Sequence, residues 1–220
     1  MQKLTPTKPL FIMLYGYPGA GKSLLARQLT GSLNAAHLQD DRIRFELFEK
    51  PIYNNEENHV VSSLMNYMAG EFLSAGVSVI YDTNSMRLAQ RRALRNLAIK
   101  MHAETLLIWL QIDVESAFAR VNKRDRRRTD DRYSQPLNRS EFDHMRSGMQ
   151  NPATSENYLV VSGKHVFNTQ RSAILRRLRE LGVVDTGDSS SQVIKPGLVN
   201  LVPNIMAGRV DMSRRNITIR

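Results

Sequence analysis

Eight consecutive residues near the amino end carry the clearest chemical pattern of the chain. They fit the phosphate-binding pattern G-x-x-x-x-G-K-[ST] at each fixed position, and they are Gly16, Tyr17, Pro18, Gly19, Ala20, Gly21, Lys22 and Ser23. In this pattern glycines let backbone N–H groups turn toward a polyphosphate, and the start of the next helix adds positive potential. We expect Lys22 to reach the β- and γ-phosphates and the Ser23 hydroxyl to bind Mg²⁺.

The flanking segments support this interpretation. The apolar run Phe11–Tyr15 predicts a buried strand before the loop, and Leu24, Leu25 and Leu29 recur at helical spacing after it. A strand, a glycine loop and a helix in this order form the context in which the pattern binds nucleotides. We therefore predict a nucleotide site from Gly16 to Leu24. The alternative is a glycine-rich turn that carries a Lys and a Ser by chance.

Strands and helices alternate along the rest of the chain. Apolar runs predict five strands, at residues 11–15, 35–38, 77–81, 105–112 and 158–161. Helical spacing predicts helices between them, at residues 22–33, up to 48, from 54 or 55 to 75, 86–102, from 114, 140–149 and 170–181, with Asp113 and Ser140 as caps. Arg87, Arg91, Arg92 and Arg95 are predicted to form a solvated face of the helix 86–102, and contact with substrate is the alternative. This order favours a parallel sheet covered by helices on both faces.

Carboxylates follow two of the predicted strands. Asp40 and Asp41 come after the second strand, and Asp82 ends the third. Ligands bind at the carboxyl edge of parallel strands, so Asp41 could accept a proton from an acceptor hydroxyl and Asp82 could bind Mg²⁺ through water. Arg44, one helical turn further on, could hold the acceptor or stabilise Asp41. In the alternative interpretation Asp40 or Asp41 only caps a short helix.

Composition limits the class of protein. The chain has 220 residues, a formal net charge of +10 and no cysteine, which excludes disulfides, cysteine-ligated zinc and thiol catalysis. No stretch reaches the roughly 18 apolar residues of a membrane span, and we expect a cytoplasmic protein. The positive charge favours polyanionic partners, nucleic acid among them. Arg120 to Arg132 holds seven basic residues against three acidic ones, and we expect a basic lid here, with Arg120 at the nucleotide.

The chain resembles the small P-loop kinases, a group with the kinase domain of bacteriophage polynucleotide 5′-hydroxyl kinase, zeta toxins, gluconate kinase and chloramphenicol phosphotransferase. The resemblance covers roughly residues 11–182. It rests on the glycine loop, on Asp41-Arg42-Ile43-Arg44 as the D-x-x-R element, on Val79-Ile80-Tyr81-Asp82-Thr83-Asn84 with Arg91-Arg92 downstream, and on the arginines from Arg120 to Arg128. The Asp-Thr-Asn sequence is most similar to the polynucleotide kinase branch.

The resemblance implies a P-loop NTPase-type three-layer sandwich that binds ATP and Mg²⁺. It also implies that Asp41 is the general base, that Arg44 contacts the acceptor side, and that Arg124 or Arg126 engages the nucleotide phosphates. Spacing does not choose between these two arginines. The kinase domain is predicted over residues 1–184, with the lid at about 120–140. Residues 185–220 are predicted to be a linker and a basic tail that match no known segment.

Three functions remain open from the sequence. The first is an ATP-dependent phosphotransferase whose acceptor hydroxyl belongs to a polynucleotide 5′ end or a nucleotide. The second is a nucleotide-dependent binding or switch module with little transfer, and the third is a kinase of a small metabolite or sugar nucleotide. A GTPase is disfavoured, because Asn122-Lys123-Arg124-Asp125 spells N-K-x-D on a predicted helix rather than at a strand end.

Overall fold

Five parallel strands form the centre of the protein. The computed structural model describes residues 3–127 and 131–184, so that Arg128 of the predicted lid and the predicted tail lie outside the described residues. The strands are β1 (Leu10–Tyr15), β2 (Ala35–Gln39), β3 (Ser78–Asp82), β4 (Glu104–Gln111) and β5 (Tyr158–Ser162). Their order in the sheet is β2-β3-β1-β4-β5, and each neighbouring pair is parallel. The predicted parallel sheet is confirmed.

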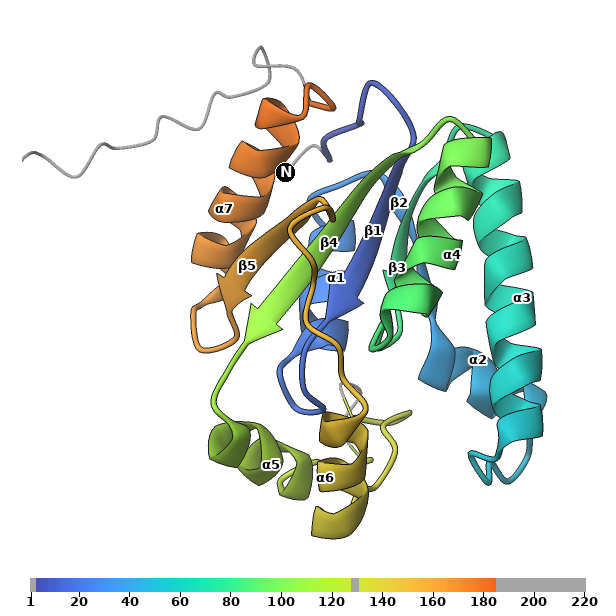
Figure 1. Ribbon diagram of the computed structural model, residues 1–220, viewed down its shortest axis with the longest axis vertical. Coiled ribbons are helices and arrows are strands. Elements are labelled where there is room, and N and C mark those ends of the chain that lie inside the picture. The colour runs from blue at the N-terminus through green and yellow to red at the C-terminus, as the bar shows by residue number, and fades with distance from the viewer. Residues whose placement is uncertain (1–2, 128–130, 185–220) are drawn as a thin grey trace, which may run out of the picture. The chain divides into compact units, whose positions relative to one another are not determined.

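Helices cover both faces of this sheet. They are α1 (Lys22–Thr30), α2 (Asp40–Leu47), α3 (Asn55–Ser74), α4 (Leu88–Lys100), α5 (Val114–Asn122), α6 (Arg139–Ser147) and α7 (Phe167–Glu180). Figure 1 shows α3 and α4 on one face and α1 with α7 on the other, which confirms the three layers. The same view shows α5 and α6 beyond the end of β4, and these two helices flank the segment 120–140 in which the lid was predicted.

The central strand β1 explains the two cores. Its six residues are all buried, which is expected of a strand with helices on both sides. Leu10, Ile12 and Leu14 belong to the core with residues of α1 and α7, and the alternate residues pack with α3 and α4. A third, smaller cluster joins Ala117 and Val121 of α5 to Leu137 and Phe142. That cluster fixes the lid segment to the domain.

The caps of two helices test the sequence prediction. The carboxylate of Asp113 accepts a hydrogen bond from the backbone N–H of Ser116 at 2.8 Å, so the predicted cap of α5 is confirmed. The prediction that Ser140 caps α6 is wrong. Asn138 is the cap, and its side chain forms a reciprocal capping box with Glu141. This box accounts for the earlier start of the helix, because it satisfies two N–H groups at once.

Arg91 is the largest departure from the sequence prediction. It was expected on a solvated face of α4, and it is completely buried. The reason is its spacing, because Arg91 lies on the same side of α4 as the buried residues Leu94 and Ala98. Its guanidinium group binds both carboxylate oxygens of Glu156 at 2.8 and 2.9 Å. Arg87 and Arg92 are exposed as predicted, and Arg95 is half-buried.

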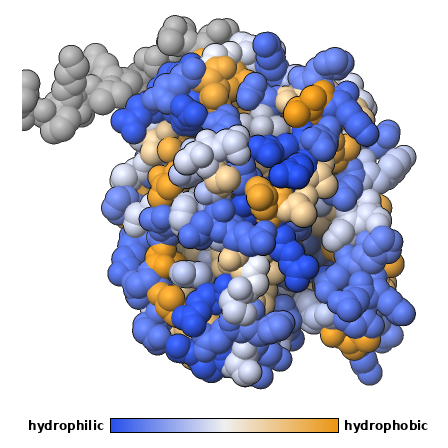
Figure 2. Space-filling view, in the orientation of Figure 1, coloured by the Kyte–Doolittle hydropathy of each residue, from blue (hydrophilic) through white to orange (hydrophobic). Residues whose placement is uncertain are grey.

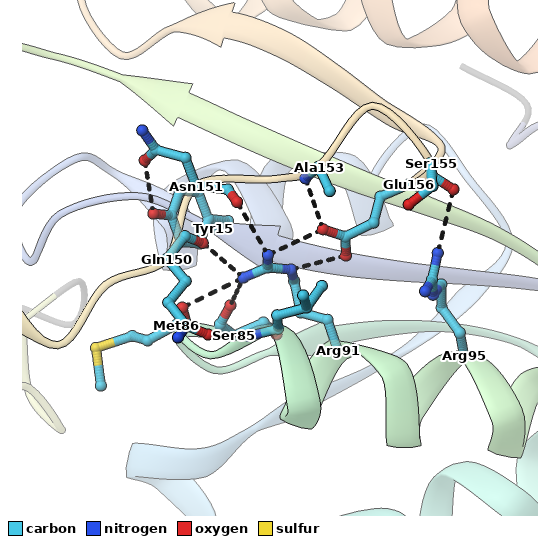
Figure 3. A network of polar contacts seen from close by, with 11 residues as sticks. Tyr15, Ser85, Met86, Arg91, Arg95, Gln150, Asn151, Ala153, Ser155 and Glu156 are labelled. Carbon is cyan, nitrogen blue, oxygen red and sulfur yellow. Dashed lines mark hydrogen bonds and ion pairs between the residues drawn. The ribbon is translucent and has the colours of Figure 1, made fainter.

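Figure 3 shows what this arginine connects. It donates to the backbone carbonyls of Ser85 and Met86, in the loop after β3, and to those of Gln150 and Asn151, which precede β5. The side chain of Arg91 thereby joins the loop after β3 to the segment before β5.

In the orientation of Figure 1 the molecular surface is mostly hydrophilic, and its hydrophobic residues form small separate groups (Figure 2). Within the described ranges, no helix has the length and apolar character needed to cross a membrane.

Candidate active site

The loop between β1 and α1 is shaped by glycine. Gly19 has a φ of +81°, and a Cβ placed on it would lie 2.2 Å from the carbonyl oxygen of Ala117 in α5. A Cβ on Gly16 would lie 2.5 Å from the carbonyl oxygen of Leu110 in β4. Real Cβ atoms do not approach oxygen so closely, so both positions exclude a side chain. The loop can therefore press against β4 and α5 only because it lacks side chains there.

Lys22 opens helix α1 and bends back over the loop. Its Nζ donates to the carbonyl oxygens of Gly16 at 2.9 Å and Tyr17 at 3.1 Å. Burial lowers the pKa of Lys22 to about 8, although the charge of Asp82 opposes this shift. The first N–H groups of a helix have no partner within the helix, and here they begin directly after the loop. A polyanion at this point would meet both the helix end and the ammonium group.

Ser23 and Asp82 form a pair of oxygen donors. The Ser23 hydroxyl donates to Oδ1 of Asp82 at 3.1 Å, and His37 contacts the other carboxylate oxygen at 3.0 Å. Mg²⁺ takes oxygen ligands and keeps several waters or phosphate oxygens, so this donor set fits it. Residues 3–127 and 131–184 contain no group of three or more His, Cys, Asp or Glu side chains arranged for a metal. A site of this kind would therefore depend on nucleotide oxygens for its other ligands.

The two acids after β2, Asp40 and Asp41, begin helix α2 and line the same cleft as Lys22, Ser23 and Asp82. The Asp40 carboxylate accepts from the backbone N–H of Asp41 at 2.7 Å and from the Thr83 hydroxyl at 2.5 Å. Burial, together with the charge of Asp82, raises the pKa of Asp40 to about 6. The carboxylate of Asp41 accepts no hydrogen bond from a described residue. Burial and the charges of Asp40 and Asp82 raise the pKa of Asp41 well above its ordinary value.

The start of helix α2 tests the alternative interpretation that Asp40 or Asp41 only caps a short helix. Helix α2 begins at Asp40, and Gln39 precedes it as the cap residue without a side-chain bond. Asp40 bonds its neighbour's N–H, so it contributes to the start of α2. Asp41 makes no such bond, and it lines the cleft. A capping role accordingly fits Asp40 better than Asp41.

Arg44 is placed at the junction of two helices. It is only 6% exposed, and its guanidinium donates to Glu57 at 3.0 Å and to Asn58 at 2.6 Å, both in α3. It also lies over the ring of Tyr53, with 4.8 Å from Cζ to the ring centroid. Its charge still acts on Asp41, where it lowers the pKa against the larger effect of burial. A contact between Arg44 and an acceptor stays a prediction. In the structure, the bonds from Arg44 to Glu57 and Asn58 hold α2 against α3.

The structure separates the lid arginines that the sequence could not. Arg124 lines the cleft, donates to the carbonyl of Gln135 at 3.1 Å, and acts electrostatically on both Lys22 and Asp41. Arg120 also lines the cleft, and it donates to the carbonyl of Gly163 at 2.9 Å. Arg126 is exposed, bonds the carbonyl of Ser134, and lies outside the cleft wall. Arg124 is thus better placed than Arg126 to meet a phosphate.

Most of these groups line one cleft of about 650 Å³, but His37, Arg44 and Arg126 are not part of its wall. Its wall includes the predicted residues from Pro18 to Leu24, with Asp41, Asp82, Arg120 and Arg124, while Gly16 and Tyr17 face a neighbouring groove. Sequence reasoning missed part of the wall, namely Gln28, Asn84, Gln135 and the segment 163–167. Only Asn84 had a signal, the Asp-Thr-Asn sequence after β3. The others come from segments whose composition is ordinary, and only folding brings them to the cleft.

Comparison with known families agrees with this geometry. Residues 11–152 match the family described as the AAA domain. The chain belongs to this family. The matched segment of the AAA domain runs from β1 through the lid to the end of α6, so it contains the glycine loop, Asp41, Asp82 and Arg124. No curated protein matches the chain.

Solved structures show the same fold at low sequence identity. Chaetomium thermophilum Kti12 in complex with ADP-AlF3 is 18% identical, with a TM-score of 0.61 over 80% of this chain and 100% of its own. A gluconokinase from Sinorhizobium meliloti 1021 is 15% identical, with a TM-score of 0.56 over 82% and 95%. Mycobacterium tuberculosis APS kinase CysC in complex with AMPPNP and APS is 14% identical, with a TM-score of 0.58 over 79% and 99%. The protein therefore has the α/β fold of P-loop NTPases and small kinases.

Proposed function

We propose that this protein is a phosphotransferase that moves the γ-phosphate of ATP to an acceptor hydroxyl, with Asp41 as the general base. The observation that carries the proposal is the placement of Asp41, whose carboxylate accepts no hydrogen bond from the described part of the chain, in the same cleft as Lys22 and Arg124. Phosphoryl transfer needs positioned phosphates, positive charge around the moving group, and a proton acceptor. The cleft contains a candidate for each of these parts.

The triphosphate would lie along the glycine loop. Backbone N–H groups of residues 19–23 and the ammonium of Lys22 would bind its oxygens, and Arg124 would approach from the lid. Ser23 and Asp82 would hold Mg²⁺, which supplies charge neutralisation between phosphate oxygens when it is bound. The bonds from Lys22 to Gly16 and Tyr17 would then be exchanged for bonds to phosphate. Each of these residues would bind or orient the nucleotide, and Asp41 would accept the proton of the acceptor hydroxyl.

The raised pKa of Asp41 suits a general base. A base is most effective when its pKa lies near the working pH, because it is then both ionised and sufficiently basic. Burial and the neighbouring acids raise the pKa of Asp41, and Arg124 limits the rise. Once the hydroxyl attacks, its proton would pass to this carboxylate. Turnover should therefore increase with pH through the ionisation of Asp41.

A nucleic-acid 5′-hydroxyl is our preferred acceptor. It is supported by the net charge of +10 and by an aromatic and cationic cluster between α2 and the lid. There Phe45 and Tyr133 are in ring contact at 5.7 Å, with Arg126 over the first ring and Arg132 over the second. Aromatic rings combined with arginine are typical of surfaces that contact single-stranded nucleic acid. A nucleotide, a small metabolite or a sugar nucleotide is the alternative acceptor.

Two variants test the proposed chemistry. Lys22→Ala should weaken ATP binding and abolish transfer, whereas Asp41→Asn should bind ATP normally and lose about 10²–10⁴-fold in turnover. Binding would be measured by calorimetry and transfer with γ-labelled ATP. The acceptor panel would contain 5′-hydroxyl oligonucleotides, nucleosides, sugars and sugar nucleotides. Normal turnover by Asp41→Asn would refute the role of Asp41, and label on a small metabolite alone would refute the nucleic-acid acceptor.

The switch module is the second candidate, suggested by the basic segment of residues 185–220 beyond the kinase-like part. Removing these residues separates the two functions. Under the kinase proposal the shortened chain keeps its transfer activity. Loss of partner binding with little transfer in either form would favour the switch.

A further inference from the structure

Asp82 has two different hydrogen-bond partners, one for each carboxylate oxygen. It ends β3 and is only 2% exposed. Oδ1 accepts from the Ser23 hydroxyl at 3.1 Å, and Oδ2 lies 3.0 Å from Nε2 of His37 in β2. A buried carboxylate needs such partners, because an unpaired one would be costly. The Ser23 bond belongs to the proposed Mg²⁺ site, and the His37 bond has no part in the function described so far.

The strand register explains why His37 reaches this carboxylate. His37 pairs with Ile80 across the parallel strands β2 and β3, and Gln39 pairs with Asp82. Alternate residues of a strand point to the same face, so His37, Ile80 and Asp82 share one face of the sheet. Ile80 packs in the core with residues of α1, which identifies that face. Since Ser23 lies at the start of α1, the three polar side chains meet from three separate elements.

We propose that His37 is a positioning residue that fixes the carboxylate of Asp82 for Mg²⁺ in the proposed ATP site. A carboxylate held at one oxygen cannot rotate freely, so the imidazole keeps Oδ1 directed at Ser23. The inference rests on the proposed function, because it assigns His37 a role toward the metal that ATP brings. Partners behind a metal-binding residue typically change metal affinity by about 10–100-fold when they are removed.

The contact needs no charged histidine. An ionised carboxylate only accepts hydrogen bonds, and an imidazole that carries one proton, on Nε2, is sufficient to donate to it. The side chain of His37 is 22% exposed and the side chain of Asp82 is 2% exposed. Solvent thus reaches the histidine but hardly reaches the carboxylate. Removing the imidazole would leave Oδ2 of Asp82 without its partner.

Mn²⁺ and a non-hydrolysable ATP analogue provide the test. Free Mn²⁺ is measured by its electron paramagnetic resonance signal during titration of the protein with the analogue bound. His37→Leu should bind Mn²⁺ about 10–100-fold more weakly than the wild type. Its affinity for the analogue in the presence of EDTA should not change, since His37 does not line the cleft. His59→Leu replaces an exposed histidine of α3 and serves as the matched control.

Two amide variants keep the test decisive if His37→Leu folds poorly. The side-chain nitrogen of Gln reaches the position of Nε2, so His37→Gln should retain Mn²⁺ affinity within about threefold. The nitrogen of Asn falls short, so His37→Asn should resemble the leucine variant. Equal Mn²⁺ affinity in wild type, His37→Asn and His37→Leu would overturn the positioning role alone. If the wild type binds the analogue no better with Mn²⁺ than without it, the proposed function fails instead.

Discussion

The buried pair of Arg91 and Glu156 should be the most sensitive point for stability outside the hydrophobic core. Replacing Arg91 with Met removes the positive charge and leaves Glu156 in the interior. The two side chains are 0% and 1% exposed, so water cannot compensate the lost partner. Breaking a buried ion pair on one side typically costs about 3–5 kcal/mol. Arg91→Met should therefore lower the free energy of unfolding by about that amount.

The hydrogen bonds of Arg91 place the expected loss toward the upper end of this range. Besides its two bonds to Glu156, the guanidinium donates hydrogen bonds of 3.0–3.4 Å to four backbone carbonyls, those of Ser85, Met86, Gln150 and Asn151. A buried acceptor left without a donor costs about 1–3 kcal/mol. For a domain of 150–250 residues 1 kcal/mol shifts the Tm by about 2–4 °C, so a loss of about 5 kcal/mol would lower the Tm by roughly 10–20 °C.

Urea unfolding and thermal unfolding measure this loss, with Arg92→Met as control. Arg92 is exposed on the same helix, so its replacement should stay within about 0.5 kcal/mol. Arg91→Met combined with Glu156→Met should lose less than the sum of the two single variants, because no buried charge is left. A loss below about 1 kcal/mol for Arg91→Met, or full additivity in the double variant, would refute the reasoning.

The pH dependence of the same pair gives an internal check. Burial alone would raise the pKa of Glu156, but the bonds from Arg91 and from the Ala153 N–H keep it below its ordinary value. A lowered pKa contributes stability above the unfolded value, and this contribution is lost as pH falls through the folded value. The difference between wild type and Arg91→Met should therefore shrink as the pH falls below the ordinary pKa of a glutamate. An undiminished difference in acid would contradict the ionic account.

Three further predictions concern the cleft. Gly19→Ala should lose most of its ATP affinity in calorimetry, because its Cβ would lie 2.2 Å from the carbonyl oxygen of Ala117. The control Gly148→Ala should bind ATP normally, since its Cβ would lie 3.7 Å from the nearest atom. Equal ATP affinities of the two variants would contradict the loop geometry. Asp40→Asn should raise the Tm at pH 8 and not at pH 4. The reason is that the pKa of Asp40 is raised to about 6 in the folded protein, so its ionised form destabilises the fold as the pH rises. A lower Tm of the variant at pH 8 would contradict this explanation. Arg124→Leu should reduce phosphoryl transfer about 10²-fold. Arg127 lies on the exposed surface, so Arg127→Leu should not reduce transfer. Equal effects of the two variants would refute a role of Arg124 in transfer.

Local patterns in the sequence were sufficient for the fold. The five strands and the helices between them follow from apolar runs and helical spacing, with boundaries that differ from the structure by a few residues. The glycine loop between Gly16 and Ser23 could also be predicted, because its residues are adjacent in the chain and its flanks have clear periodicity. The acids at the strand ends could be placed at one edge, since parallel strands end together. These features depend on neighbours in sequence.

Only the tertiary structure decided the roles of the charged residues. Three arginines of α4 look alike in the sequence, yet only Arg91 is fully buried. Its charge partner is Glu156, which follows it by 65 residues. Arg124 and Arg126 differ by two positions, and only the first turns into the cleft. The contact of His37 with Asp82 likewise depends on strand register. Burial and long-range pairing set the energy of a charge, and both are properties of the folded chain.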